Sequence, residues 1–138
     1  MMWDKVTLKT KKNAQNQTKI WRKDDQVLII NPGYLKASDF GLTADLRVYL
    51  MLTHVALDTC ARLAQLKIDL KAKFYTHAIF LPKLCSLRLW ASRAGLCGVY
   101  IPKANRVWTD PHASIEDLGV SYTLESRGEE KYLTYMFL

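Results

Sequence analysis

The sequence lacks the short motifs that identify most metal and nucleotide sites. Its three cysteines, Cys60, Cys85 and Cys97, are widely spaced, so no close pair of the Cys-x2-Cys type predicts a zinc site. An odd number of cysteines at irregular spacing is not a disulfide framework, which favours a reducing compartment. The glycine-containing stretches NPG and RAGLCG do not have the spacing of a phosphate-binding loop. We therefore expect no metal and no cofactor.

Long apolar segments are also missing. The longest, residues 46–57, contains Arg47 and His54 and is shorter than the roughly 20 residues that a helix needs to cross a bilayer. The first twelve residues, MMWDKVTLKTKK, lack the apolar centre of a secretion signal. These features predict no transmembrane segment and a cytoplasmic protein, in the host cytosol if the source is viral.

The composition is that of a globular protein with a basic charge. The chain has 138 residues, of which 49% are hydrophobic and 24% charged, and this size predicts a single domain over residues 1–138. The formal net charge is +7, yet residues 111–138 hold five acidic and only two basic side chains. The positive charge therefore lies in the first 110 residues. A basic surface favours polyanionic partners.

Strand patterns occur near both ends of the chain. Residues 3–10 alternate like a strand, and residues 11–19 read as a flexible basic loop. Two hairpins are expected, one over residues 20–30 around Asp24-Asp25 and one over residues 120–137 around a turn at 126–129. A third hairpin, over residues 99–108, is expected around the loop PKAN, and one helical turn over 114–118. The ends of the chain therefore predict an antiparallel sheet.

Helical patterns fill the middle. Apolar residues recur at three- and four-residue steps from Thr43 to Ile68, which predicts a buried central helix over 43–68. Because proline suits only the first turn of a helix, Pro82 divides the next stretch into helices over 72–80 and 82–94. The order of strands, helices and strands predicts the α+β class, with the sheet packed on the central helix and on one or two further helices.

Catalytic residues cannot be assembled from this pattern. The candidate ligands or nucleophiles are His54, Cys60, His77, Cys85, Cys97 and His112. On a helix His54 and Cys60 would not share a face, whereas His54 and Asp58 would be neighbours four residues apart. Such a pair orients an imidazole in some sites, but more often it is a surface hydrogen bond. The sequence therefore does not predict an enzyme.

Nucleic-acid binding is the leading prediction. Residues 72–108 have the order of a winged helix: a helix, a tight turn, a second helix and a basic hairpin. The basic loop 11–19 lies between Trp3 and Trp21, an arrangement that suits single-stranded nucleic acid. The expected mechanism is electrostatic binding of DNA or RNA without catalysis. The residues expected to contact nucleic acid are Lys11, Lys12, Lys19, Lys83, Ser86, Arg88, Arg93, Lys103 and Arg106.

The alternative is a viral or mobile-element protein with a structural or inhibitory role. Four tryptophans and seven tyrosines supply anchors for a protein–protein or membrane-surface interface. The last strand pattern, Tyr132 to Leu138, would expose an edge that pairs with another subunit if it lies outermost in its sheet. A homodimer or other homo-oligomer is compatible with this reading.

Overall fold

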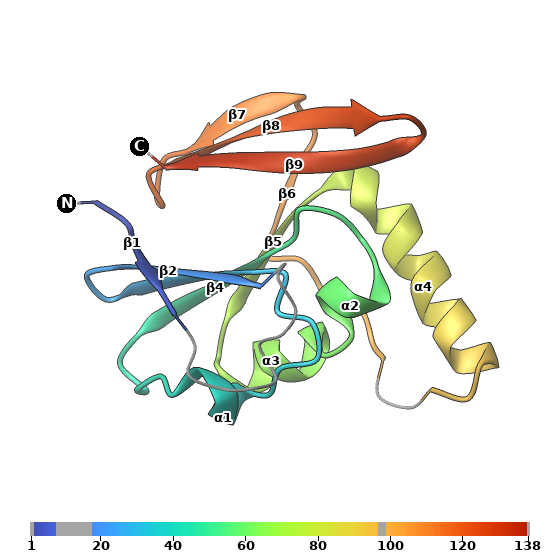
Figure 1. Cartoon of the computed structure of the whole chain (residues 1–138), viewed down its shortest axis with the longest axis horizontal. Coiled ribbons are helices and arrows are strands. Elements are labelled where there is room, and N and C mark those ends of the chain that lie inside the picture. Colours follow the sequence, from blue (N-terminus) through green and yellow to red (C-terminus); the bar gives the residue numbers. More distant parts are fainter. Residues whose placement is uncertain (1, 8–17, 97–98, 138) are drawn as a thin grey trace.

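The chain folds into three layers (Figure 1). The computed structural model describes residues 2–7, 18–96 and 99–137. A six-stranded sheet forms the middle layer, and a three-stranded sheet lies against one of its faces. Short helices lie on the opposite face, and the longest helix runs along one side of the molecule. The interior is therefore divided into two apolar regions by the larger sheet.

The larger sheet has its strands in sequence order. Its first three strands are antiparallel, and its third to sixth strands are parallel. The strands are β1 (Asp4–Val6), β2 (Lys19–Lys23), β3 (Gln26–Ile30), β4 (Arg47–Met51), β5 (Lys73–His77) and β6 (Arg106–Trp108). Parallel neighbours need crossover connections, which here carry helices α1 (Ala37–Phe40), α2 (Leu57–Cys60), α3 (Leu63–Asp69) and α4 (Leu81–Arg93), the last preceded by a 3-10 turn, η2 (Ala78–Phe80).

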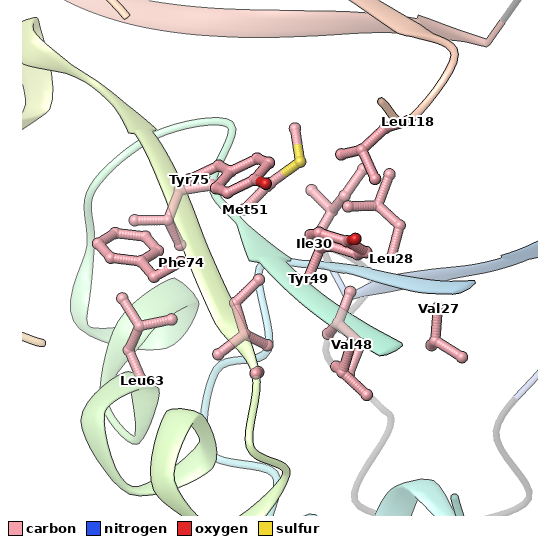
Figure 2. Packing of buried hydrophobic residues seen from close by; sticks show 14 of the residues in the cluster. Val27, Leu28, Ile30, Val48, Tyr49, Met51, Leu63, Phe74, Tyr75 and Leu118 are labelled. Atoms are coloured by element: carbon pink, nitrogen blue, oxygen red, sulfur yellow. The ribbon is translucent and has the colours of Figure 1, made fainter. Parts of the chain in front are cut away.

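Alternation along the parallel strands supplies both apolar regions. Tyr49 and Met51 of β4 point toward the smaller sheet, while Val48 and Phe74 point toward the helices (Figure 2). All five residues of β3 are buried, as expected for a strand that is covered on both faces. Leu28 and Leu50 are fully buried, so the centre of the molecule lies at β3 and β4.

The smaller sheet is an antiparallel meander. Its strands are β7 (His112–Ile115), β8 (Val120–Arg127) and β9 (Glu130–Phe137), with β8 in the middle. Several hydrogen bonds attach it to the N-terminal half. Among them, the Trp3 indole N–H donates to the Leu118 carbonyl at 2.8 Å, the Tyr135 hydroxyl to the Leu52 carbonyl at 2.6 Å, and the Leu133 N–H to the Thr53 carbonyl at 2.8 Å. These bonds place one edge of β9 over the end of β4.

The α+β class and both terminal hairpins are confirmed, but the central helix over 43–68 is wrong. The hairpins are β2–β3 and β8–β9, and the helix predicted over 82–94 is α4. Within 43–68, residues 47–51 form the parallel strand β4, followed by two short helices. The run from Val48 to Met51 is apolar on both faces, and periodicity cannot distinguish a buried parallel strand from a buried helix.

The winged helix over 72–108 is also wrong. Residues 73–77 form strand β5 rather than a helix, and β6 pairs in parallel with β5 instead of closing a hairpin over 99–108. Asn105 fixes this pairing, because its side-chain oxygen accepts the Phe74 N–H at 2.9 Å. The helical turn expected over 114–118 is replaced in part by strand β7. No helix of the described residues is long and apolar enough to cross a membrane.

Candidate functional site

A pocket of about 420 Å³ lies where the parallel strands β3 and β4 end, next to β9. In open sheets of this kind, ligands bind outside the carboxyl ends of parallel strands. Side chains from the ends of β3 and β4, from β2 and from the β8–β9 hairpin surround it. They are Lys19, Trp21, Ile30, Asn31, Thr53, His54, Glu125, Arg127, Tyr132, Leu133, Thr134, Tyr135 and Phe137.

Asn31 and Thr53 join the ends of β3 and β4. The Asn31 amide nitrogen donates to the Thr53 hydroxyl at 2.8 Å, and the Thr53 N–H donates to the Asn31 side-chain oxygen at 2.9 Å. Asn31 has a φ of 55°, in the left-handed region, which asparagine tolerates better than most residues. The Thr53 carbonyl also accepts the Leu133 N–H. Thr53 is therefore held from three directions at the pocket wall.

The two hydrogen bonds between Asn31 and Thr53 form a clamp. His54 follows this clamp directly in the sequence and lines the pocket. Its Nδ1 lies 2.9 Å from the Thr53 hydroxyl oxygen, and its ring centroid lies 5.3 Å from that of Tyr132. A hydroxyl both donates and accepts, so Thr53 pairs with Nδ1 whether or not that nitrogen carries the proton. When Nδ1 carries the proton, Nε2 is a base, and when Nε2 carries it, Nε2 is a hydrogen-bond donor. The arrangement orients an imidazole for proton transfer at Nε2.

The remaining walls combine aromatic rings with charge. Trp21 and Phe137 pack with their ring centroids 4.2 Å apart. The Arg127 guanidinium lies over the Tyr132 ring at 5.3 Å, which holds it at the rim of the pocket. With Lys19 and Arg127 against Glu125, the charged lining is net positive. The pocket therefore suits a molecule with an apolar body and a negative group.

The side chains around His54 do not fit a metal centre. A catalytic zinc ion needs three protein ligands, and the part of the chain that the structure describes brings together no group of three His, Cys, Asp or Glu side chains. The Thr59 hydroxyl is occupied by the Ala56 N–H and by backbone carbonyls, and the Cys60 thiol donates to the Ala56 carbonyl at 3.1 Å. Burial raises the pKa of Cys60 to about 11, so it remains a thiol, whereas metals bind the thiolate.

The residues predicted to contact nucleic acid come from several elements of the described chain, and their role stays a prediction. Lys83, Ser86, Arg88 and Arg93 are exposed on α4, and among the predicted residues that the structure describes Lys19 alone lines the pocket. Arg106 forms an ion pair with Asp117 at 3.0 Å, and Lys103 is exposed in the connection that precedes β6. Lys11 and Lys12, like most of the loop 11–19, lie outside the described residues, as does Cys97. Homo-oligomer formation stays a prediction.

The sequence marks His54 as a candidate residue but does not reveal its partners. It placed His54 on a helix beside Asp58, whereas His54 lies in the connection after β4. The available signal was local: Asn31 follows the apolar run 27–30, and Thr53-His54 follows the apolar run 48–52. Polar residues placed directly after buried strands lie at the same edge of a parallel sheet, but this signal requires both runs to be read as strands.

The fold is that of the metallo-β-lactamases. Similar solved structures include a metallo-β-lactamase of Novosphingobium pentaromativorans (18% identity, TM-score 0.62, covering 87% of this chain and 48% of that one), a protein in a di-iron-bound form (19%, 0.68, 95% and 66%) and a B3 metallo-β-lactamase (17%, 0.61, 99% and 67%). This chain thus spans between about half and two thirds of their length. No family model and no curated protein matches the sequence.

These similarities correct the functional predictions. A non-catalytic nucleic-acid-binding protein was expected, with a viral or mobile-element structural or inhibitory protein as the alternative. The structures that share this fold are instead metallo-β-lactamases and a di-iron-bound protein, a group of enzymes and metal-binding proteins. Both predictions are therefore wrong, as is the expectation that the chain is not an enzyme.

Proposed function

We propose that the chain is a hydrolase domain that acts on small carbonyl compounds in the pocket at the ends of β3 and β4. The observation that carries the proposal is the position of His54, an imidazole oriented by Thr53 at the carboxyl end of a parallel strand and beside a pocket of about 420 Å³. The metallo-β-lactamase fold supports it, because similar structures bear the names of hydrolases.

The sequence at the pocket supports the same proposal. One similar structure, a metallo-β-lactamase of Cronobacter sakazakii at 15% identity and a TM-score of 0.53, is described by a HARLDQ motif. Residues 54–59 of this chain read HVALDT, with His54, Leu57 and Asp58 at the spacing of the His, Leu and Asp of that motif. In this chain the segment begins at the pocket wall, directly after the Thr53 clamp.

The proposed reaction uses His54 for proton transfer and no metal. Nε2 accepts a proton from water while the water oxygen bonds to the carbonyl carbon of the substrate and the π electrons of the C=O bond move onto the carbonyl oxygen, from which they return when the leaving group departs. The bond from that carbon to the leaving oxygen or nitrogen then breaks, and the proton passes from Nε2 to the leaving atom. Lys19 and Arg127 bind a negative group of the substrate, and Trp21 and Phe137 pack on its apolar part.

The test is hydrolysis of a chromogenic carboxyl ester and a chromogenic β-lactam by the purified chain, with chelator and with added zinc. The decisive variant is His54→Gln, which keeps the size and polarity of the side chain but removes the titrating ring. The matched control is His112→Gln, because His112 is exposed on β7 and is not part of this pocket. General acid–base catalysis contributes about a hundredfold or more to rate.

We expect turnover that survives the chelator, falls at least about a hundredfold in His54→Gln, and is unchanged in His112→Gln. Turnover that is equal in wild type and His54→Gln would refute the role of His54. Turnover that disappears with chelator and returns with zinc would refute the metal-free reaction. If neither substrate is hydrolysed above the rate of the buffer, the proposal of a hydrolase for small carbonyl compounds is wrong.

A further inference from the structure

A second cavity, of about 310 Å³, lies beside α2 and α3 and shares no lining residue with the pocket at His54. Its walls combine apolar side chains with one cation. They are Tyr34, Leu57, Ala61, Arg62, Gln65, Leu96 and Val99. The volume falls at the lower end of the range of small-molecule sites, so the cavity suits a compact ligand.

Arg62 in this wall forms no ion pair with any residue that the structure describes. Its Nε is buried and forms no hydrogen bond within the described residues. The ion pairs of these residues join Arg47 to Asp25 and Arg106 to Asp117, and no carboxylate lies within 4 Å of the Arg62 guanidinium. A buried donor of a charged group without an acceptor is costly, because it loses water and gains nothing in return.

The backbone at Arg62 is held in place. The Arg62 N–H donates to the Gly33 carbonyl at 3.2 Å, and Arg62 lies between α2 and α3, so two elements fix its position. The neighbouring polar group is already engaged, since the Gln65 amide nitrogen donates to Asp69 at 2.8 Å. The unsatisfied donor on the cavity wall is therefore that of Arg62.

We propose that this cavity binds a small carboxylate with an apolar tail. The planar guanidinium presents parallel N–H groups that match the two oxygens of a carboxylate. A carboxylate oxygen of the ligand therefore accepts the hydrogen bond of the unsatisfied Arg62 Nε–H. The tail packs on Leu57, Ala61, Leu96 and Val99, which surround the cation with apolar surface. A ligand with a charge alone would leave the apolar wall without a contact, and a ligand with an apolar body alone would leave the Arg62 Nε donor unsatisfied.

The test is a titration of the whole chain with hexanoate, with hexanol as the neutral match and inorganic phosphate as the anion without a tail. The readout is the NMR signal of the Arg62 Nε–H, with that of Arg127 as a reporter of the other pocket. Ligands of this size bind over roughly 1–100 mM. Arg62→Met keeps the length of the side chain without its charge, and Arg88→Met, on the exposed surface of α4, is the matched control.

We expect hexanoate to shift the Arg62 signal to saturation and to bind at least about tenfold more tightly than hexanol or phosphate, because a hydrogen bond to a charged group contributes about that factor or more. Binding should weaken about tenfold in Arg62→Met and remain unchanged in Arg88→Met. Equal affinity for hexanol, or a shift at Arg127 instead of Arg62, would overturn the proposal. The comparison of ligands on the wild-type chain decides the matter even if Arg62→Met does not fold.

Discussion

Replacing Asn31 tests whether the clamp that orients the candidate site forms in solution. Asn31→Gly and Asn31→Ala both remove the two hydrogen bonds to Thr53 and leave the Thr53 N–H without its acceptor. Each hydrogen bond contributes about 1 kcal/mol, and a buried unsatisfied donor adds to the loss, so we expect the lost hydrogen bonds alone to cost both variants about 2–3 kcal/mol.

The two variants differ in backbone strain. With a φ of 55° at this position, alanine adds about 1–2 kcal/mol that glycine avoids. Glycine loses about 0.4–1 kcal/mol through the greater freedom of its unfolded chain. The alanine variant should therefore be the less stable of the two, by up to about 1.6 kcal/mol.

The assay is urea unfolding followed by tryptophan fluorescence, with Ser86→Ala on exposed α4 as the control, expected to stay within about 0.5 kcal/mol of wild type. A double-mutant cycle of Asn31→Gly with Thr53→Ala should show a coupling of about 1 kcal/mol, because the residues share hydrogen bonds. A loss below about 1 kcal/mol in Asn31→Ala, or zero coupling, would show that the clamp does not form.

Two further predictions concern the ionisable core. Because burial raises the pKa of Cys60 to about 11, we expect its thiol to resist a disulfide reagent at pH 8 while exposed Cys85 reacts; equal rates measured by mass spectrometry would contradict the burial of Cys60. Burial and the hydrogen bond to Asp117 raise the pKa of Tyr75 to about 12, above its unfolded value near 10, so its stabilising effect is complete below pH 10 and is lost as the pH rises toward 12. Tyr75→Phe should flatten the loss of unfolding free energy over this pH window, and an unchanged slope would count against the assignment.

Local chemistry made several elements of this fold predictable. The hairpin β2–β3 combines apolar arms with the turn Asp24-Asp25, where Asp24 adopts a φ of 55°. Helix α4 begins with proline in its first turn, as predicted from Pro82, and the C-terminal hairpin turns at Gly128 with a φ of 63°. In each case the information lies within a few residues, so no partner is needed to interpret it.

The candidate site was less predictable because its residues come from separate elements. The sequence marked His54 as a candidate residue, but the orientation of its ring depends on the Thr53 hydroxyl. Thr53 is in turn held by Asn31, which lies 22 residues earlier in the sequence. Tyr132 reaches the ring from the last hairpin. With a helix over 43–68 in place of β4, neither Asn31 nor Tyr132 was expected to lie beside Thr53 and His54, so the site was missed.

The sequence by itself determined the two terminal hairpins with their turns, the charge distribution and the α+β class, since these follow from properties of neighbouring residues. The tertiary structure alone decided that residues 47–51 and 73–77 are strands, because a run such as Val48–Met51 is buried on both faces only when parallel neighbours and two covering layers are present. It also decided where His54 and Arg62 lie, since a pocket is formed by segments distant in sequence, and their approach is a result of packing rather than of local preference.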